Sequence, residues 1–287
     1  AMFSNSNLSQ NFHLVLIRTD SEGNEIWRTQ FDGPNGSPLS ASITITKSEE
    51  FIIAAGYTLN LDPLLGMLVK VHQNGKRDWA HTMYNKAVTC VKQHRDDSIY
   101  LTGFHQEDIE VKSWLAQFDT EGRKTWEKNM ADGYIFSMDI TRDGGIICGG
   151  LNPESKSVNW IPFLVKSDNQ GKVEWSQTYN AKITESHFYV TQTNKNAYVF
   201  TSLQQHPETL NNNLILVKTD NKGSVEWWRN YGTPESNEYG ICVKQARDKG
   251  FIVTGVTNRF EDNQNIYVLK TDEEGLAALA VTNRDNK

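Results

Sequence analysis

The stretch LILVKTDNKGSVEW at residues 214–227 decides the fold, because its pattern returns along the whole chain. In it an apolar run leads to a basic residue and an Asp, a Gly follows three residues after the Asp, and a Trp follows four residues after the Gly. Five other stretches share most of this pattern: LVLIRTDSEGNEIW at 14–27, MLVKVHQNGKRDW at 67–79, WLAQFDTEGRKTW at 114–126, FLVKSDNQGKVEW at 163–175 and IYVLKTDEEGLAAL at 266–279. The six glycines are spaced 52, 47, 49, 52 and 52 residues apart, so the chain is built of repeats of about 50 residues.

A second phrase lies between the copies of the first and in most cases ends in a glycine. It reads FIIAAG at 51–56, SIYLTG at 98–103, GIICGG at 145–150, AYVFTS at 197–202 and FIVTG at 251–255. Turn residues come before it, and alternating runs such as TCVKQ at 89–93 come before those turns. Each repeat thus contains four short strands, which we call A to D in chain order. Four strands in this period with no helical segment predict an all-β fold, a β-propeller of four-stranded blades.

The repeats place five complete A–B–C–D units in a single domain of residues 1–287, after one C–D hairpin at 13–31. The expected units are 40–83, 87–130, 134–179, 186–231 and 238–282. Six C–D hairpins favour six blades with the first one incomplete, whereas five A strands favour five blades, and we prefer six. Leu279 occupies the Trp position of the last copy, so a degenerate final blade is expected.

The shared residues of the C–D hairpin each have a mechanical role. The Asp accepts hydrogen bonds from its own turn, and the Gly supplies the positive φ of a tight hairpin. The Trp buries a large ring that can pack one blade against its neighbour. The residues expected in this docking role are Trp27, Trp79, Trp126, Trp175 and Trp227.

With these roles, the copies resemble the tryptophan-docking repeat of quinoprotein-like (PQQ-like) β-propellers and bacterial repeat proteins written around VKTD-x-x-G-x-x-x-W and DGG-F-I-x-x-G. The resemblance covers nearly the whole chain and implies the fold. It also implies an exported or cell-surface protein of bacteria. A cytoplasmic location stays open, because the three cysteines Cys90, Cys148 and Cys242 show no pairing.

Composition and charge exclude several classes of function. The formal net charge is −6 and no basic cluster relieves it, so binding of nucleic acid is not expected. No apolar run approaches the roughly 20 residues that span a bilayer, so membrane insertion is not expected either. The Asp-x-x-G turns lack the alternating oxygen ligands of a calcium loop, and the histidines show no paired spacing. We therefore expect no metal and no cofactor.

The strand order predicts where a partner would bind. A–B and C–D turns are tight and repetitive and lie at one end of the blades, whereas D–A and B–C loops differ in every repeat and lie at the other. Variable loops on a rigid scaffold are the usual place for binding. The candidate binding residues at this end are Tyr84, Tyr134, Asp139, Trp160, His187 and Tyr239.

These features favour a non-catalytic binding scaffold with a protein or glycan partner. One alternative is an enzyme, either of lyase or hydrolase type or quinone-dependent, with its site in the central channel. Against it, no paired carboxylates and no Ser–His–Asp cluster break the repeat pattern, and only Asp139 is an unusual acidic residue on an A strand. A second alternative is a structural repeat segment of a larger surface protein. No catalytic residue is predicted.

Overall fold

The computed structural model describes residues 2–5, 12–32, 36–59, 64–108, 110–153, 160–180, 187–206, 208–258 and 265–277. Within these ranges every regular element is a β-strand, and no helix is found. No described helix can therefore cross a membrane. The chain divides into two compact units, residues 1–140 with 168–172, and residues 141–167 with 173–287.

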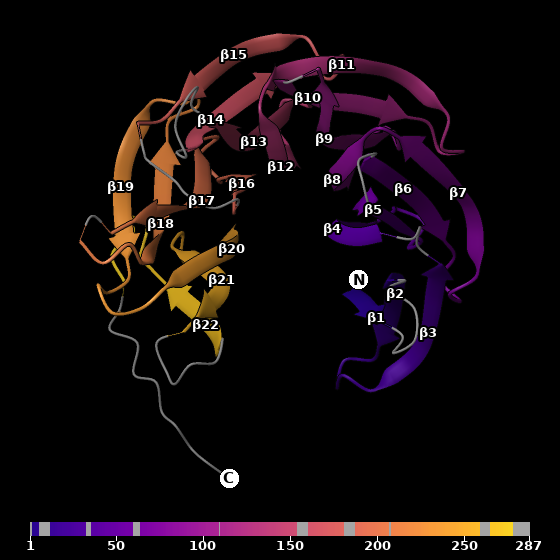
Figure 1. Cartoon of the computed structure of the whole chain (residues 1–287), viewed down its shortest axis with the longest axis horizontal. Coiled ribbons are helices and arrows are strands. Elements are labelled where there is room, and N and C mark those ends of the chain that lie inside the picture. The colour runs from indigo at the N-terminus through magenta and orange to yellow at the C-terminus, as the bar shows by residue number, and fades with distance from the viewer. Residues whose placement is uncertain are drawn as a thin grey trace. The chain divides into compact units, whose positions relative to one another are not determined.

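The first unit contains one three-stranded and two four-stranded antiparallel sheets (Figure 1). The three-stranded sheet consists of β1 (Met2–Asn5), β2 (Phe12–Thr19) and β3 (Glu25–Asp32). The next sheet consists of β4 (Gly36–Ile45), β5 (Phe51–Leu59), β6 (Leu64–Val71) and β7 (Arg77–Tyr84). The third consists of β8 (Ala87–Gln93), β9 (Ile99–Glu107), β10 (Glu110–Phe118) and β11 (Lys124–Asp132), and β12 (Tyr134–Ile140) follows it.

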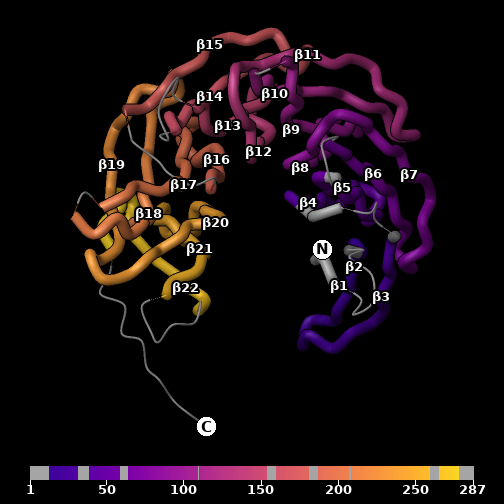
Figure 2. The backbone as a smooth tube through the Cα atoms, in the orientation of Figure 1, coloured from indigo at the N-terminus to yellow at the C-terminus, as the bar shows by residue number. Residues whose placement is uncertain are grey.

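The second unit repeats the same plan, which Figure 2 traces in the backbone alone. Strand β12 begins the sheet that continues with β13 (Ile146–Pro153), β14 (Trp160–Ser167) and β15 (Val173–Thr178). The next sheet consists of β16 (Tyr189–Gln192), β17 (Tyr198–Gln205), β18 (Asn212–Thr219) and β19 (Val225–Tyr231). The last consists of β20 (Glu238–Gln245), β21 (Phe251–Thr257) and β22 (Asn265–Lys270).

These sheets are the blades of a β-propeller, as the repeats predict. In each of the four-stranded sheets the strands follow chain order, A to D. The last sheet has strands A to C, and the bridge between Thr271 and Ala277 marks the start of its D strand. The described residues thus give five blades with all four positions, the smaller number that the repeats allow. The sheet β1–β3, which has no A strand among the described residues, is an additional incomplete unit, and its strand β1 adds to the expected hairpin at 13–31. Leu279 lies outside the described residues.

The central parts of the C strands β10, β14 and β18 are buried on both faces, because each blade packs between its neighbours in its unit, whereas β22 of the last sheet exposes Ile266 and Val268. All eight residues of β18 are buried, and its Leu214 and Leu216 belong to the core that includes Val243 and Phe251 of the following sheet. In the first unit Leu68 of one blade packs with Val91 and Trp114 of the next. A continuous apolar run is what such a doubly covered strand requires.

Each motif tryptophan lies against the C–D turn glycine of the next repeat. A Cβ added to Gly223 would lie 2.8 Å from the Trp175 ring, so only a glycine lets the ring approach this closely. The same relation holds for four other pairs: Trp27 with Gly75, Trp79 with Gly122, Trp126 with Gly171 and Trp227 with Gly275. The five rings are partly rather than fully buried, since each lies at the edge of the joint between two blades.

The turn aspartates hold the hairpins closed. Asp168 Oδ1 accepts the backbone N–H groups of Gln170 at 2.9 Å and Lys172 at 2.8 Å. Four other turns repeat these two bonds at Asp20, Asp119, Asp220 and Asp272. Every such oxygen is engaged within its own turn, as expected of a hairpin signature.

Acid should weaken the hairpin that Asp168 closes. The hydrogen bond from the Lys172 N–H, against a smaller opposing effect of burial, lowers the pKa of Asp168 below its usual value. A lowered folded-state pKa adds stability above the unfolded pKa of about 4, and that stability is lost as the pH falls through the folded value. We expect wild type to be more stable than Asp168→Asn at pH 7 and the difference to be smaller at pH 3. Urea unfolding at both pH values tests this, and a pH-independent difference would contradict it.

Candidate functional site

The end of the blades formed by the tight turns contains a repeated ionic joint. Lys166, which is 2% exposed, lies 3.2 Å from the Asp143 carboxylate and 3.0 Å from that of Glu174. Its equivalents in other blades are also paired with acidic residues of adjacent strands or turns: Lys70 with Glu50 and Asp78, Lys218 with Glu226, and Lys270 with Asp248. Repetition in blade after blade indicates a structural role.

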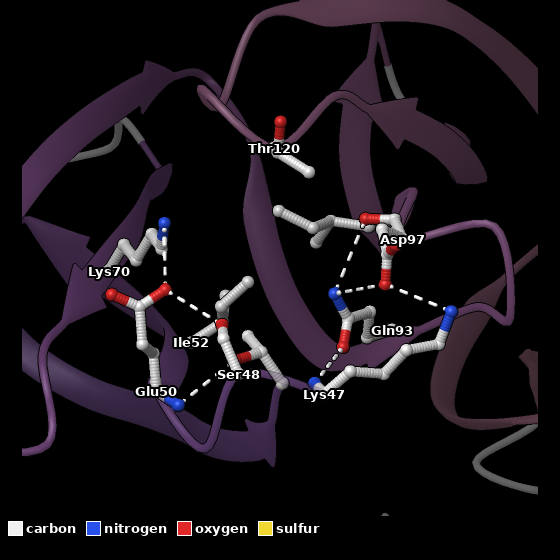
Figure 3. A pocket seen from close by; sticks show the side chains of 10 residues that line it. Lys47, Ser48, Glu50, Ile52, Lys70, Gln93, Asp97 and Thr120 are labelled. Atoms are coloured by element: carbon white, nitrogen blue, oxygen red, sulfur yellow. Dashed lines mark hydrogen bonds and ion pairs between the residues drawn. The ribbon is translucent and has the colours of Figure 1, made fainter.

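Figure 3 shows a pocket of about 240 Å³ at one such joint in the first unit, between the sheets β4–β7 and β8–β11. Its polar side chains are bound to one another. Lys47 pairs with Asp97 at 3.1 Å and donates its backbone N–H to Gln93 at 3.0 Å. The same glutamine clamp recurs in the second unit, where Gln192 accepts the backbone N–H of Arg142 at 2.9 Å. The pocket is below the roughly 300 Å³ of a small-molecule site, and its groups are already used to join blades.

A cluster of possible metal ligands borders this pocket. Ligand atoms of Glu50, His72 and Asp78 lie within 4.8 Å of one another. The ammonium of Lys70 lies 3.0 Å from Glu50 and 3.3 Å from Asp78, so a cation is already in place. Burial raises the pKa of Glu50, but bonds from Lys70, His72 and Ser48 outweigh it, and the net pKa is lowered. We regard this cluster as an ionic joint.

The opposite end of the blades differs in chemistry. In the second unit the D–A loop at 232–237 lies between the start of β18 and the end of β21. Asn237 Oδ1 accepts the backbone N–H of Asn212 at 2.7 Å, and Asn258 Oδ1 accepts that of Asn237 at 2.7 Å. Asn211 donates to the Pro234 carbonyl at 2.6 Å. D–A and B–C loops thus meet at one end, as the strand order predicts, in a corner held by amide side chains.

Two predicted binding residues meet at this corner. The rings of His187 and Tyr239 have centroids 5.4 Å apart, and both side chains are partly exposed. Tyr239 follows Glu238 at the start of β20, and His187 precedes β16. Trp160 begins β14, in the blade before that of β16, and lies opposite Pro153 of the neighbouring strand β13. The loops 154–159, 181–186 and 259–264 lie outside the described residues.

The other three predicted residues are in the first unit, two of them on β12 and one on β7. Tyr134 begins β12, where its ring packs at 4.7 Å against Phe104 and burial raises its pKa. Asp139 lies further along β12, and its carboxylate accepts the Ile140 N–H at 3.1 Å. Tyr84 is 72% exposed at the end of β7. Strand β7 is a D strand, so it lies at the edge of its blade opposite to the A strand. Tyr84 and Tyr134 both lie where D–A connections are expected, and Asp139 lies further along the A strand.

The sequence analysis missed the most buried acidic group of the loop corner. Glu238 is 2% exposed, and its carboxylate accepts hydrogen bonds from Ser236 and from Thr257 at 3.3 Å. The polar run Gly-Thr-Pro-Glu-Ser-Asn-Glu at 232–238 covers the connection between the expected units 186–231 and 238–282, and none of its residues is among the candidate residues. Nothing in the sequence distinguishes the buried Glu238 from the exposed Glu235 three residues earlier.

No family model and no curated protein matches the chain. Solved structures do match it in fold. A protein of unknown function from Dyadobacter fermentans has a TM-score of 0.57 and 12% identity over 84% of this chain and 80% of its own. The Dos1 propeller has a TM-score of 0.57 and 13% identity over 93% of this chain and 68% of its own. A GH43_1 enzyme from Xanthomonas citri covers 85% of this chain and 90% of its own at a TM-score of 0.48 and 9% identity. At these identities the likeness concerns the propeller fold alone.

Proposed function

We propose that the chain is a non-catalytic binding scaffold, which holds a protein or glycan partner at the end of its blades formed by the D–A and B–C loops. The observation that carries this proposal is the difference between the two ends. The tight turns use their Asp, Lys and Gln side chains to close hairpins and join blades. The loop corner of the second unit instead places the partly exposed rings of His187 and Tyr239 side by side. Aromatic residues beside polar groups are typical of binding hot spots.

The proposal is tested by screening the full chain on a glycan array and by capture of proteins, followed by measured dissociation constants. Tyr239→Ala and Tyr134→Ala are expected to weaken binding by about 2 kcal/mol, roughly 30-fold, because each removes an aromatic anchor. Lys222→Ala, in a tight turn at the other end, is the matched control and should leave the dissociation constant unchanged. Loss of affinity in Lys222→Ala with none in the tyrosine variants would place binding at the tight-turn end and contradict the proposal.

The enzyme alternative has its own outcome in the same set of variants. If a glycan is cleaved rather than held, and Asp139→Asn abolishes turnover while the circular dichroism of the fold is retained, the chain is an enzyme. An exported location is a part of the proposal that rests on the resemblance of the repeats.

A further inference from the structure

Two buried oxygen atoms at the loop corner have no donor. Glu238 Oε1 accepts from Ser236 and Thr257, but its Oε2 is buried and has no hydrogen-bond partner among the described residues. Asn213 lies on β18 and is 6% exposed, and its Oδ1 is also buried without a hydrogen-bond partner among the described residues. No described Lys, Arg or His lies within ion-pair distance of Glu238. A buried carboxylate without a cation or a full set of donors is strongly unfavourable.

The two oxygen atoms face the same space. A Cβ added to Gly232 would lie 2.4 Å from Asn213 Oδ1 and 2.6 Å from Glu238 Oε2. Gly232 has a φ of 155°, which side-chain-bearing residues rarely adopt, and without a Cβ it lets both oxygen atoms approach its backbone. Two acceptors that converge from different blades are the arrangement of a cation site, since only a positive or donating group can lie between them.

We propose that this corner binds a Ca²⁺ ion between Glu238 Oε2 and Asn213 Oδ1. Both are hard oxygen donors, a carboxylate and an amide carbonyl, which are ordinary ligands of calcium. The loop hydroxyl of Ser236 donates to the same carboxylate and is itself hydrogen-bonded to the hydroxyl of Thr233. Calcium accepts irregular coordination completed by water, whereas magnesium demands a near-octahedral site that two side chains of fixed strands do not supply.

The ion would fasten one blade to the next at their loop end. Asn213 belongs to the C strand β18, and Glu238 begins the A strand β20 of the following blade. Between them runs the D–A loop at 232–237, which is otherwise held by the amide contacts of Asn237. A cation here neutralises the buried charge and fixes this loop, and the binding of a partner is not required for that effect.

The experiment uses the full chain, stripped with a chelator and dialysed, with Ca²⁺ alone as the probe. Isothermal titration is expected to show one site with a Kd of about 10⁻⁴ to 10⁻³ M, as for sites with few charged ligands. Ca²⁺ at roughly 100 times its Kd should raise Tm by about 5 °C. Equal ionic strength of Na⁺ or Mg²⁺ should not. No heat and no rise in Tm, or an equal rise with Na⁺ or Mg²⁺, would overturn the proposal.

Two variants give results of opposite sign. In Glu238→Gln the new amide can donate to Asn213 Oδ1, so this variant should melt above wild type in chelator and should not respond to Ca²⁺. Asn213→Asp adds a second carboxylate, so it should bind Ca²⁺ about tenfold more tightly and melt below wild type in chelator. Glu235→Gln removes the same charge from the exposed part of the loop and should keep the wild-type response. If Asn213→Asp does not tighten binding, the ion lies elsewhere and the proposal fails.

Discussion

Trp114→Ala is expected to lower the free energy of unfolding by about 4 kcal/mol, the largest effect of any single truncation proposed for this chain. The Trp114 ring is 0% exposed on the C strand β10 and packs with Leu68 and Val91 of the core between two blades. The Lys86 ammonium lies 5.2 Å from its centroid. Removal of the ring leaves a cavity that the strands on either side cannot close, because their hydrogen bonds fix their spacing.

The motif tryptophan Trp175 is the matched comparison. It is partly exposed over Gly223, so Trp175→Ala should cost only about 2 kcal/mol. Urea unfolding followed by far-ultraviolet circular dichroism measures both without relying on tryptophan fluorescence. Trp114→Phe should cost less than about 1.5 kcal/mol, since it keeps an aromatic ring and removes an indole N–H that has no partner among the described residues. An equal loss for Trp114→Ala and Trp175→Ala would mean that the motif ring contributes as much stability as the core ring, which contradicts the prediction.

The sequence predicts the tryptophans of the motif but not their rank in energy. Glycine and tryptophan recur at fixed spacing because each pair forms the same contact between neighbouring repeats, so self-comparison finds them. A tryptophan occurs at this C-strand position only in the repeat of Trp114. The equivalent residue of the preceding repeat is Met67. Self-comparison of the sequence identifies only the contacts that all blades share. The burial of a single side chain depends on the residues of its particular neighbouring blade.

In the candidate site, too, the sequence predicts the arrangement of the strands but not the positions of single side chains. Strand order was enough to predict that D–A and B–C loops gather at one end, and the amide contacts of Asn237 bear that out in the second unit. The positions of single side chains in those loops were not predictable, since no repeat equivalent exists for them. Tyr84 ends a D strand and Tyr134 begins an A strand, and how their side chains are packed could not be predicted from the strand order. Glu238 was overlooked because its burial depends on tertiary neighbours such as Thr257 of β21, which no pattern in its own repeat reveals.

The glycine that ends the B-strand phrase has a stricter role than the sequence suggests. In the third sheet Gly103 lies opposite Val88, next to a bulge in the A strand β8. A Cβ on Gly103 would lie 1.9 Å from the carbonyl oxygen of Ala87, which is backbone and cannot rotate away. The equivalent position in the sheet β16–β19 is Ser202. The A strand of that sheet, β16, has only four residues and begins at Tyr189. A side chain is tolerated at this position where the A strand is short.

Gly103→Ala is therefore expected to lower the free energy of unfolding by about 3 kcal/mol, because the bulge of β8 must move away from β9 to admit a single methyl group. Ser202→Ala is the matched control. It removes one hydrogen bond to the His187 carbonyl, at 3.2 Å, and should cost only about 1 kcal/mol. Denaturant unfolding of the two variants, with amide hydrogen exchange of β8, measures both the loss and its place. A Gly103→Ala variant as stable as wild type would show that the A strand can straighten, and the bulge would then be a consequence of the glycine and not its cause.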